Sequence, residues 1–152
     1  MSNSPGLCQS FKKDLLNGVH AFSVASGGKV SADAFYGALY SATANLSPTS
    51  TTAYTTQGEV SASGSYVAGG VELTNSTAPN ASSGTAYWTP SANIIITSFT
   101  ASNFDSLLIY NNTVTGKNAV GIFSFNPQSI TAGTFTLTMP TNSNTTGLIR
   151  IA

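Results

Sequence analysis

The apolar positions over residues 7–19 recur with the period of an α-helix. Leu7, Phe11 and Leu15 stand four residues apart, which is the spacing of a helix that buries one face. The same period widens the apolar stripe with Cys8, Leu16 and Val19 and sets on the opposite face Lys12, Lys13 and Asp14. Asn17-Gly18 supplies the helix stop, because glycine tolerates the left-handed conformation found there.

From about residue 30 the pattern changes to a period of two, which is typical of β-strands. In 134–140, "TFTLTMP", the apolar Phe135, Leu137 and Met139 alternate with three threonines, as in a half-buried strand with a polar outer face. Alternation at 34–42 and β-branched or aromatic composition elsewhere predict further strands at 34–42, 52–61, 66–75, 94–100, 106–112, 119–126 and 148–152.

Turn signals separate these strands, among them Asn126-Pro127 and Ala132-Gly133, and residues 74–85 have the composition of a long flexible loop. Short strands at such intervals indicate an antiparallel β-sandwich or barrel. At 152 residues we expect one domain, residues 1–152, with an N-terminal α-helix at 7–19 and a β-sandwich over 30–152.

Composition narrows the range of partners. Only 7% of residues are charged and the formal net charge is zero, so no electrostatic attraction to nucleic acid or anionic membranes is expected. Hydrophobic residues make up 41%, which argues against disorder. A neutral polar surface resists association poorly, so we expect a protein that packs against other subunits. The N-terminus lacks the pattern of a signal peptide.

The glycine-rich stretch "GSYVAGGV" (64–71) has the glycine spacing of a phosphate-binding loop. Gly70 and Val71 stand where such a loop needs its lysine and its metal-binding hydroxyl. We therefore predict a bend between strands at Gly69-Gly70. Glu59 and Glu72 are lone acids, expected to be solvated or paired rather than catalytic.

Other candidate chemistry is sparse. His20 is the chain's one histidine; a hydrolase would have to pair it with Asp14, Asp33 or Asp105, but its place after the helix stop favours capping of the last carbonyls. Cys8 is the one cysteine, so neither a disulfide nor a zinc site is expected. Tyr87-Trp88 fits an aromatic core or interface anchor better than a sugar-stacking platform. No enzyme activity and no cofactor or metal are predicted.

Several motifs together resemble a family of small virion proteins of tailed bacteriophages. They are Cys-x-Ser-Phe-Lys and Gly-x-His at the helix, then Ala-Leu-Tyr, Thr-x-Tyr, Glu-Val-Ser and Gly-x-Tyr-x-Ala-Gly-Gly. They fall on Cys8, Ser10, Phe11, Lys12, Gly18, His20, Ala38, Leu39, Tyr40, Thr52, Tyr54, Glu59, Val60, Ser61, Gly64, Tyr66, Ala68, Gly69 and Gly70. Trp88 and the segments "LLIYNNT", "KNAVGIFSF" and "LIRIA" extend the resemblance over most of the chain, and residues 76–98 otherwise depart from it.

The resemblance implies a virion structural protein that is assembled in the host bacterial cytoplasm. It favours a capsid cement or decoration protein whose partner is the major capsid protein, and a homotrimer, because such proteins commonly sit at lattice symmetry axes. The residues expected at subunit or capsid contacts are Phe11, Leu15, Glu59, Tyr66, Gly69, Gly70 and Trp88. A tail or head–tail junction component remains the alternative, including a carbohydrate-binding adsorption module that uses Trp88.

Overall fold

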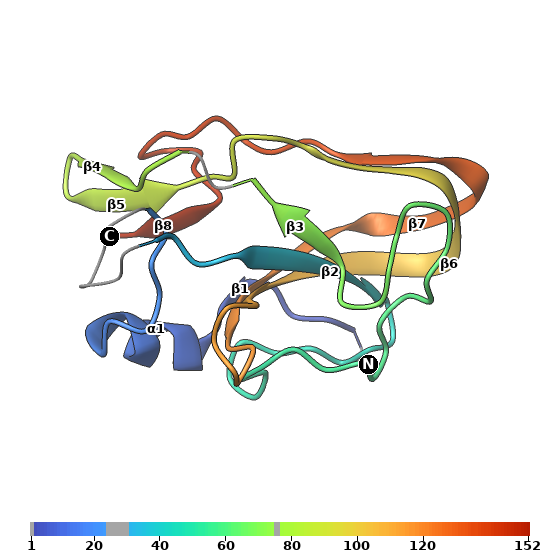
Figure 1. The fold of residues 1–152 in the computed structure, drawn as a ribbon, viewed down its shortest axis with the longest axis horizontal. Coiled ribbons are helices and arrows are strands. Elements are labelled where there is room, and N and C mark those ends of the chain that lie inside the picture. The colour runs from blue at the N-terminus through green and yellow to red at the C-terminus, as the bar shows by residue number, and fades with distance from the viewer. Residues whose placement is uncertain (1, 24–30, 75–76) are drawn as a thin grey trace.

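The computed structural model describes residues 2–23, 31–74 and 77–152. As predicted, these residues form mainly antiparallel β-structure with one short N-terminal helix. The strands form two separate sheets (Figure 1), so of the two predicted architectures the sandwich-like one is present and the closed barrel is not.

The larger sheet has five strands in the order β1-β7-β6-β2-β3. These are β1 (Gly6–Leu7), β7 (Ala119–Leu137), β6 (Ile94–Asn111), β2 (Phe35–Ser41) and β3 (Val71–Leu73). The smaller sheet has the order β4-β5-β8, with β4 (Asn80–Ser82), β5 (Thr85–Trp88) and β8 (Ile149–Ile151). The helix α1 (Gln9–Leu16) lies at the same end of the molecule as the smaller sheet (Figure 1).

The long hairpin β6–β7 provides two neighbouring strands of the larger sheet and bends along its length. Its strands run together around one end of the molecule (Figure 1), and their register shifts repeatedly between Ile96 and Ser106. Ser98 and Asn103 take φ values of 53° and 50° there, and such bulges bend a strand without ending it. Four predicted strands therefore merge into two, and the predicted turns Asn126-Pro127 and Ala132-Gly133 lie inside β7.

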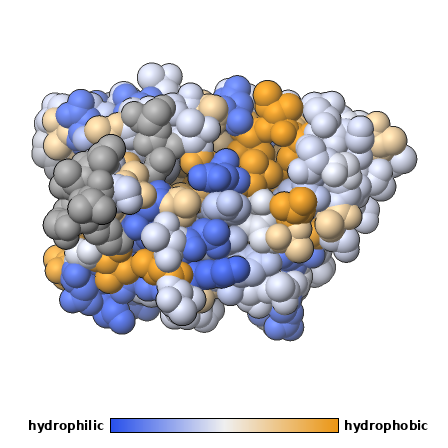
Figure 2. Space-filling model, in the orientation of Figure 1, coloured by the Kyte–Doolittle hydropathy of each residue, from blue (hydrophilic) through white to orange (hydrophobic). Residues whose placement is uncertain are grey.

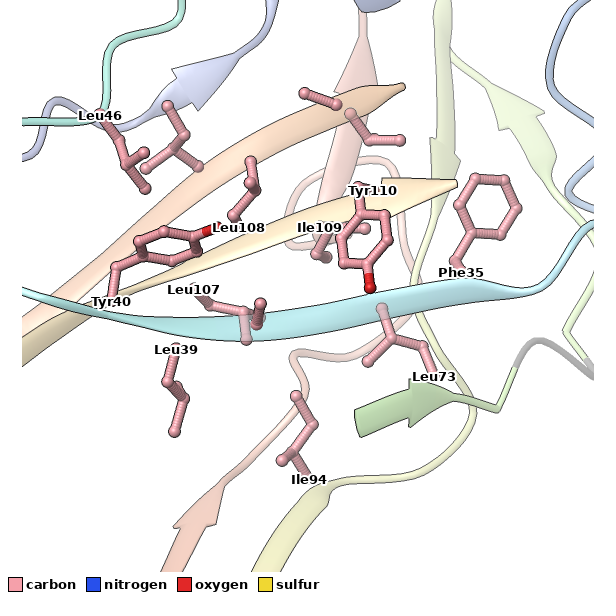
Figure 3. Close-up of a cluster of buried hydrophobic side chains, with 14 of the residues drawn as sticks. Phe35, Leu39, Tyr40, Leu46, Leu73, Ile94, Leu107, Leu108, Ile109 and Tyr110 are labelled. Carbon is pink, nitrogen blue, oxygen red and sulfur yellow. The ribbon is translucent and has the colours of Figure 1, made fainter. Parts of the chain in front are cut away.

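The core surrounds β2, which is buried on both faces. Figure 3 shows Leu39 on one side of the strand with Leu73 and Ile94, and Tyr40 on the other side with Leu46. All five side chains are at most 4% exposed. Part of the segment between β2 and β3, including Leu46, covers the Tyr40 face, so both faces of the predicted alternation at 34–42 are buried.

The helix is shorter than predicted. Leu7 belongs to β1, where it pairs with Gly121 of β7, so the helix begins only at Gln9. Its predicted stop is confirmed: Gly18 has a φ of 66°, and its N–H donates to the carbonyl of Leu15. The predicted faces are partly wrong, because Leu16 is 90% exposed and Asp14 is buried.

Three further predictions are only partly met, for local reasons. Part of the expected loop at 74–85 is the hairpin β4–β5, in which Ser83 and Gly84 both take positive φ, as a two-residue turn of this hand requires. Residues 75 and 76 lie outside the described part of the chain. The expected strand at 52–61 makes only isolated bridges, Ala53 to Asn118 and Glu59 to Tyr40, so it lies beside β2 only around Glu59. The expected strand at 66–75 shortens to β3, since the Gly69-Gly70 bend occupies its first half.

Candidate functional site

The seven residues predicted at contacts fall into two separate groups. Glu59, Tyr66, Gly69 and Gly70 gather around one carboxylate beside β2. Phe11, Leu15 and Trp88 line one cavity between α1 and the smaller sheet. The structure therefore offers two candidate regions, each assembled from segments far apart in sequence.

The Glu59 carboxylate is bonded from three sides. It accepts hydrogen bonds from the hydroxyl of Tyr54 at 2.5 Å, the hydroxyl of Tyr66 at 2.9 Å and the backbone N–H of Gly69 at 2.7 Å. The Tyr66 hydroxyl also accepts a bond from the N–H of Leu39 in β2 at 2.9 Å. One carboxylate thus fixes the segment from 54 to 69 onto the core strand.

Neighbouring tyrosines complete this arrangement. The Tyr110 hydroxyl donates to the carbonyl of Gly69 at 2.6 Å, and the Tyr40 hydroxyl donates to the carbonyl of Thr55. Burial raises the pKa of Tyr110 to about 12, with a further contribution from the negative charge of Glu59. Burial also raises the pKa values of Tyr40, Tyr54 and Tyr66 well above their usual range. All four hydroxyls therefore stay protonated at neutral pH and act as donors.

The predicted bend at Gly69-Gly70 is confirmed. The two residues have φ values of 98° and 87°, which L side chains rarely adopt. A Cβ on Gly70 would stand 2.2 Å from the carbonyl oxygen of Gly37, so the bend depends on close backbone packing against β2. The short strand β3 follows the bend, where a phosphate-binding loop would lead into a helix.

The hydrogen bonds of this first group therefore hold the fold together, and the group does not form a contact surface. Tyr66 is 1% exposed and Gly70 is buried. The neighbouring Val67 is 60% exposed and is a large apolar side chain that this loop presents to solvent. Sequence reasoning missed Val67, because a single valine among glycines and small residues gives no signal of exposure.

A second polar network lies buried beneath α1. Asn118 donates to Asp14 at 2.7 Å, and Asp14 lies 3.8 Å from Nε2 of His20. Nδ1 of His20 lies 3.0 Å from the amide nitrogen of Asn111, which also donates to Asp33 at 2.7 Å. The network joins the helix, the segment after it and both ends of the β6–β7 connection.

This geometry corrects two predictions. His20 does not cap the helix: backbone N–H groups of Asn17, Gly18 and Val19 bond the carbonyls of the last turn, and the imidazole packs 5.2 Å from the Phe11 ring. Asp14, expected on the solvated face, is 5% exposed. Of the three acids considered for a triad, Asp14 and Asp33 do belong to the network around His20. Asp105 instead accepts bonds from Asn3 and Ser106.

Trp88 belongs to an aromatic cluster. Its ring lies 4.8 Å from that of Phe22, which stacks on Phe35 at 4.3 Å. Its indole N–H donates to the carbonyl of Thr77 at 2.8 Å, and the side chain is 2% exposed. A sugar could not stack on this ring, so the platform considered for a carbohydrate module is not present at Trp88. Phe11 is likewise fully buried.

Between α1 and the smaller sheet runs an open groove made of two adjoining cavities. One, of about 360 Å³, is lined by Phe11, Leu15, Gly18, His20, Phe22, Pro79, Ala86, Tyr87, Trp88, Ile149 and Ile151. The other, of about 500 Å³, is lined by Leu7, Lys12, Leu15, Leu16, Arg150, Ile151 and Ala152. Leu15 and Ile151 belong to both linings. We call this feature the α1–β8 groove.

The predicted contact residues Phe11, Leu15 and Trp88 all line the α1–β8 groove. The residues most exposed in the groove, however, are ones that were not predicted as contacts. Leu16 is 90% and Ile151 is 43% exposed, and Leu15 is half-buried between the two cavities. Figure 2 shows hydrophobic surface at this end of the molecule, bordered by hydrophilic side chains. Phe11 and Trp88 support the groove from below.

The described cationic side chains are exposed, whereas most of the acidic ones are buried or half-buried and only Glu72 is exposed. Asp14 and Asp33 are buried, whereas Lys12, Lys13, Lys117 and Arg150 are exposed. Lys12 and Arg150 line the α1–β8 groove, and none of the described residues that line it is acidic. A neutral chain thus carries a positive surface at one end.

In comparisons with protein-family models, curated proteins and solved structures, nothing matches the chain. Within the described ranges 2–23, 31–74 and 77–152, no helix is long and apolar enough to span a membrane. Over the same ranges, no three His, Cys, Asp or Glu side chains come together in a way that could hold a metal ion.

Proposed function

We propose that the chain is a structural protein of a tailed-bacteriophage virion, where it binds the major capsid protein lattice as a cement or decoration protein. The motifs around Cys8, Glu59 and Gly70 that resemble such virion proteins support the assignment. In this proposal the protein is assembled with the particle in the host bacterial cytoplasm and stays in the finished virion.

The observation that carries the proposal is that most of the acidic side chains accept hydrogen bonds from other parts of the same chain. Asp14, Asp33, Glu59 and Asp105 each accept hydrogen bonds from within the chain. The bonds to Asp14, Asp33 and Asp105 join residues 104, 78 and 102 positions apart. Hydrogen bonds to charged groups are among the stronger ones, so these contacts hold distant segments together. A protein that stabilises a capsid needs such a rigid fold.

The outer faces of the long hairpin suit repeated weak contacts. Thr134 and Thr136 of β7 are exposed while Phe135 between them is buried, which confirms the predicted threonine-rich face. Hydroxyl groups can form hydrogen bonds across an interface without the cost of desolvating charges. A capsid lattice offers many copies of such a contact, so avidity can replace individual affinity.

We further propose a homotrimer with closed symmetry, since a lattice that repeats about threefold axes favours matching subunits. Sedimentation equilibrium of the purified protein measures this directly. A species of three times the 15.5 kDa chain mass supports the proposal, and a monomer at all concentrations contradicts the trimer.

Capsid binding is tested with particles that lack the protein. Purified chain is added to such capsids, which are then pelleted through a sucrose cushion and heated in steps. The proposal predicts saturable co-sedimentation and a higher temperature of genome release. Capsids that bind no protein and lose their genome at an unchanged temperature would contradict it.

A further inference from the structure

We propose that the α1–β8 groove binds an extended, acidic segment of a partner protein, which adds as a strand to the outer edge of β8. The inference deepens the proposed function, because only that function makes the partner a capsid subunit.

The first reason is the position of β8 at the edge of its sheet. β8 pairs with β5 through Trp88–Ile149, Tyr87–Arg150 and Ala86–Ile151, and no strand within residues 2–23, 31–74 and 77–152 lies on its other side. Among the described residues, no backbone hydrogen bond reaches that outer edge. Unpaired N–H and C=O groups on an edge strand are a template for another extended chain.

The second reason is the apolar floor beside this edge. Leu15, Leu16 and Ile151 line the larger cavity together, and Leu16 has almost its whole side chain in solvent. Side chains of an added strand point alternately to its two faces. Every second residue would therefore face this floor, which favours Val, Ile or Leu at those positions.

The third reason is charge. Lys12 and Arg150 line the cavity from opposite walls, one on α1 and one on β8, and Lys13 is exposed beside Lys12. The nearest acid in sequence, Asp14, is 5% exposed and bonded to Asn118. Among the described residues that line the groove no side chain is acidic, and complementarity selects Asp or Glu on the partner.

These features distinguish a protein segment from other anionic partners. A nucleic acid or a lipid surface would meet the same cations, but neither supplies backbone groups to pair with β8 or a regular row of apolar side chains for the floor. The alternating acid–apolar pattern uses all three features, so it is the occupant that the groove fits best.

The experiment uses the purified full chain and a fluorescein-labelled nonapeptide of alternating aspartate and valine, (Asp-Val)4-Asp. Fluorescence anisotropy should show saturable binding, and hydrogen exchange should slow at the amides of Ile149–Ile151. The peptide (Lys-Val)4-Lys should bind at least about tenfold more weakly, since like charges oppose association. Replacing the two central valines with proline should also weaken binding, because proline removes backbone donors.

Matched variants locate the site. Lys12→Glu and Arg150→Glu should each reduce affinity by about tenfold or more, whereas Lys117→Glu, with the same change in charge, should leave it unchanged. Lys117 belongs to the β6–β7 connection, where its ammonium group lies over the ring of Tyr54. It is not among the residues that line the groove. Circular dichroism checks that each variant is folded.

Several results would overturn the inference: equal loss in Lys117→Glu, protection at β3 or β4 instead of β8, or binding of a single-stranded oligonucleotide or phosphatidylserine vesicles but not of the peptide. Capsid binding separates this inference from the proposed function. If capsids bind Lys12→Glu as well as the unchanged chain, the groove assignment fails and the function stands. If the peptide binds but capsids do not, the function fails and the groove assignment stands.

Discussion

Replacing Glu59 with glutamine removes one charge from the centre of the tyrosine network while keeping the shape of the side chain. Glu59 accepts three hydrogen bonds, from Tyr54, Tyr66 and the N–H of Gly69. A glutamine amide can keep its oxygen toward two of these donors, and its NH₂ group would have to donate to the third hydroxyl. The variant therefore keeps the contacts and loses their charge assistance.

The size of the effect follows from those three bonds. A hydrogen bond to a charged group contributes about 1.5–3 kcal/mol and a neutral one about 0.5–1.5 kcal/mol, so each bond weakens by roughly 1 kcal/mol. Because the carboxylate is only half-buried, solvent screens part of this difference. We expect Glu59→Gln to lower the free energy of unfolding by about 2 kcal/mol, which corresponds to a fall in Tm of about 4–8 °C for a domain of this size.

Urea unfolding followed by fluorescence of the one tryptophan, buried Trp88, measures this change. Glu72→Gln is the matched control, because Glu72 is exposed on the edge strand β3, and it should change stability by no more than about 0.5 kcal/mol. In a double-mutant cycle, Tyr66→Phe and Glu59→Gln should be clearly non-additive. Equal and small effects of Glu59→Gln and Glu72→Gln would refute the idea that this carboxylate fastens the loop to the core.

Three further outcomes are expected. Gly84 has a φ of 79° and open space around it, so Gly84→Ala should lower the free energy of unfolding by about 1–2 kcal/mol. Gly70→Ala should lower it clearly more in the same urea assay, because the added Cβ would meet the Gly37 carbonyl. Equal losses for the two variants would contradict the close packing at Gly70. Cys8 is fully buried and burial raises its pKa to about 11, so a thiol reagent at pH 8 should label it only on unfolding, and rapid labelling of the native protein would contradict this burial. The pKa of Tyr110 is raised to about 12 from the usual value near 10, so its protonated hydroxyl stabilises the folded state fully below about pH 10. Thermal melts should show stability falling as the pH rises from about 10 to 12. A Tm that does not change over this range would count against the buried network.

Some strands were predictable from the sequence because they depend on local alternation, whereas β1, β4 and β5 were not predicted as strands. Residues 34–42 and 148–152 were expected to be strands and contain β2 and β8. Local alternation could not predict that the expected strands at 94–100 and 106–112 join to form β6. The join passes through Ser98, which takes a positive φ that serine rarely adopts in the absence of tertiary contacts. Helical periodicity also could not distinguish Asp14, buried beside Asn118, from its solvated neighbours.

The candidate site was predicted only in part. The sequence indicated Leu15 as a contact residue, and the structure places it in the α1–β8 groove. It could not indicate that Leu16 and Ile151 are exposed there, since that depends on how β8 returns beside α1 from the far end of the chain. Glu59 appeared as a lone acid because its partners Tyr54, Tyr66 and Gly69 come together only when the loop closes.

The most direct test of the proposed function is electron cryo-microscopy of the intact phage particle. The account predicts density for the two-sheet body on the capsid surface, repeated at symmetry axes, with the α1–β8 groove against an extended acidic segment of the major capsid protein. A capsid with no such density, from particles whose protein profile lacks this chain, would contradict it.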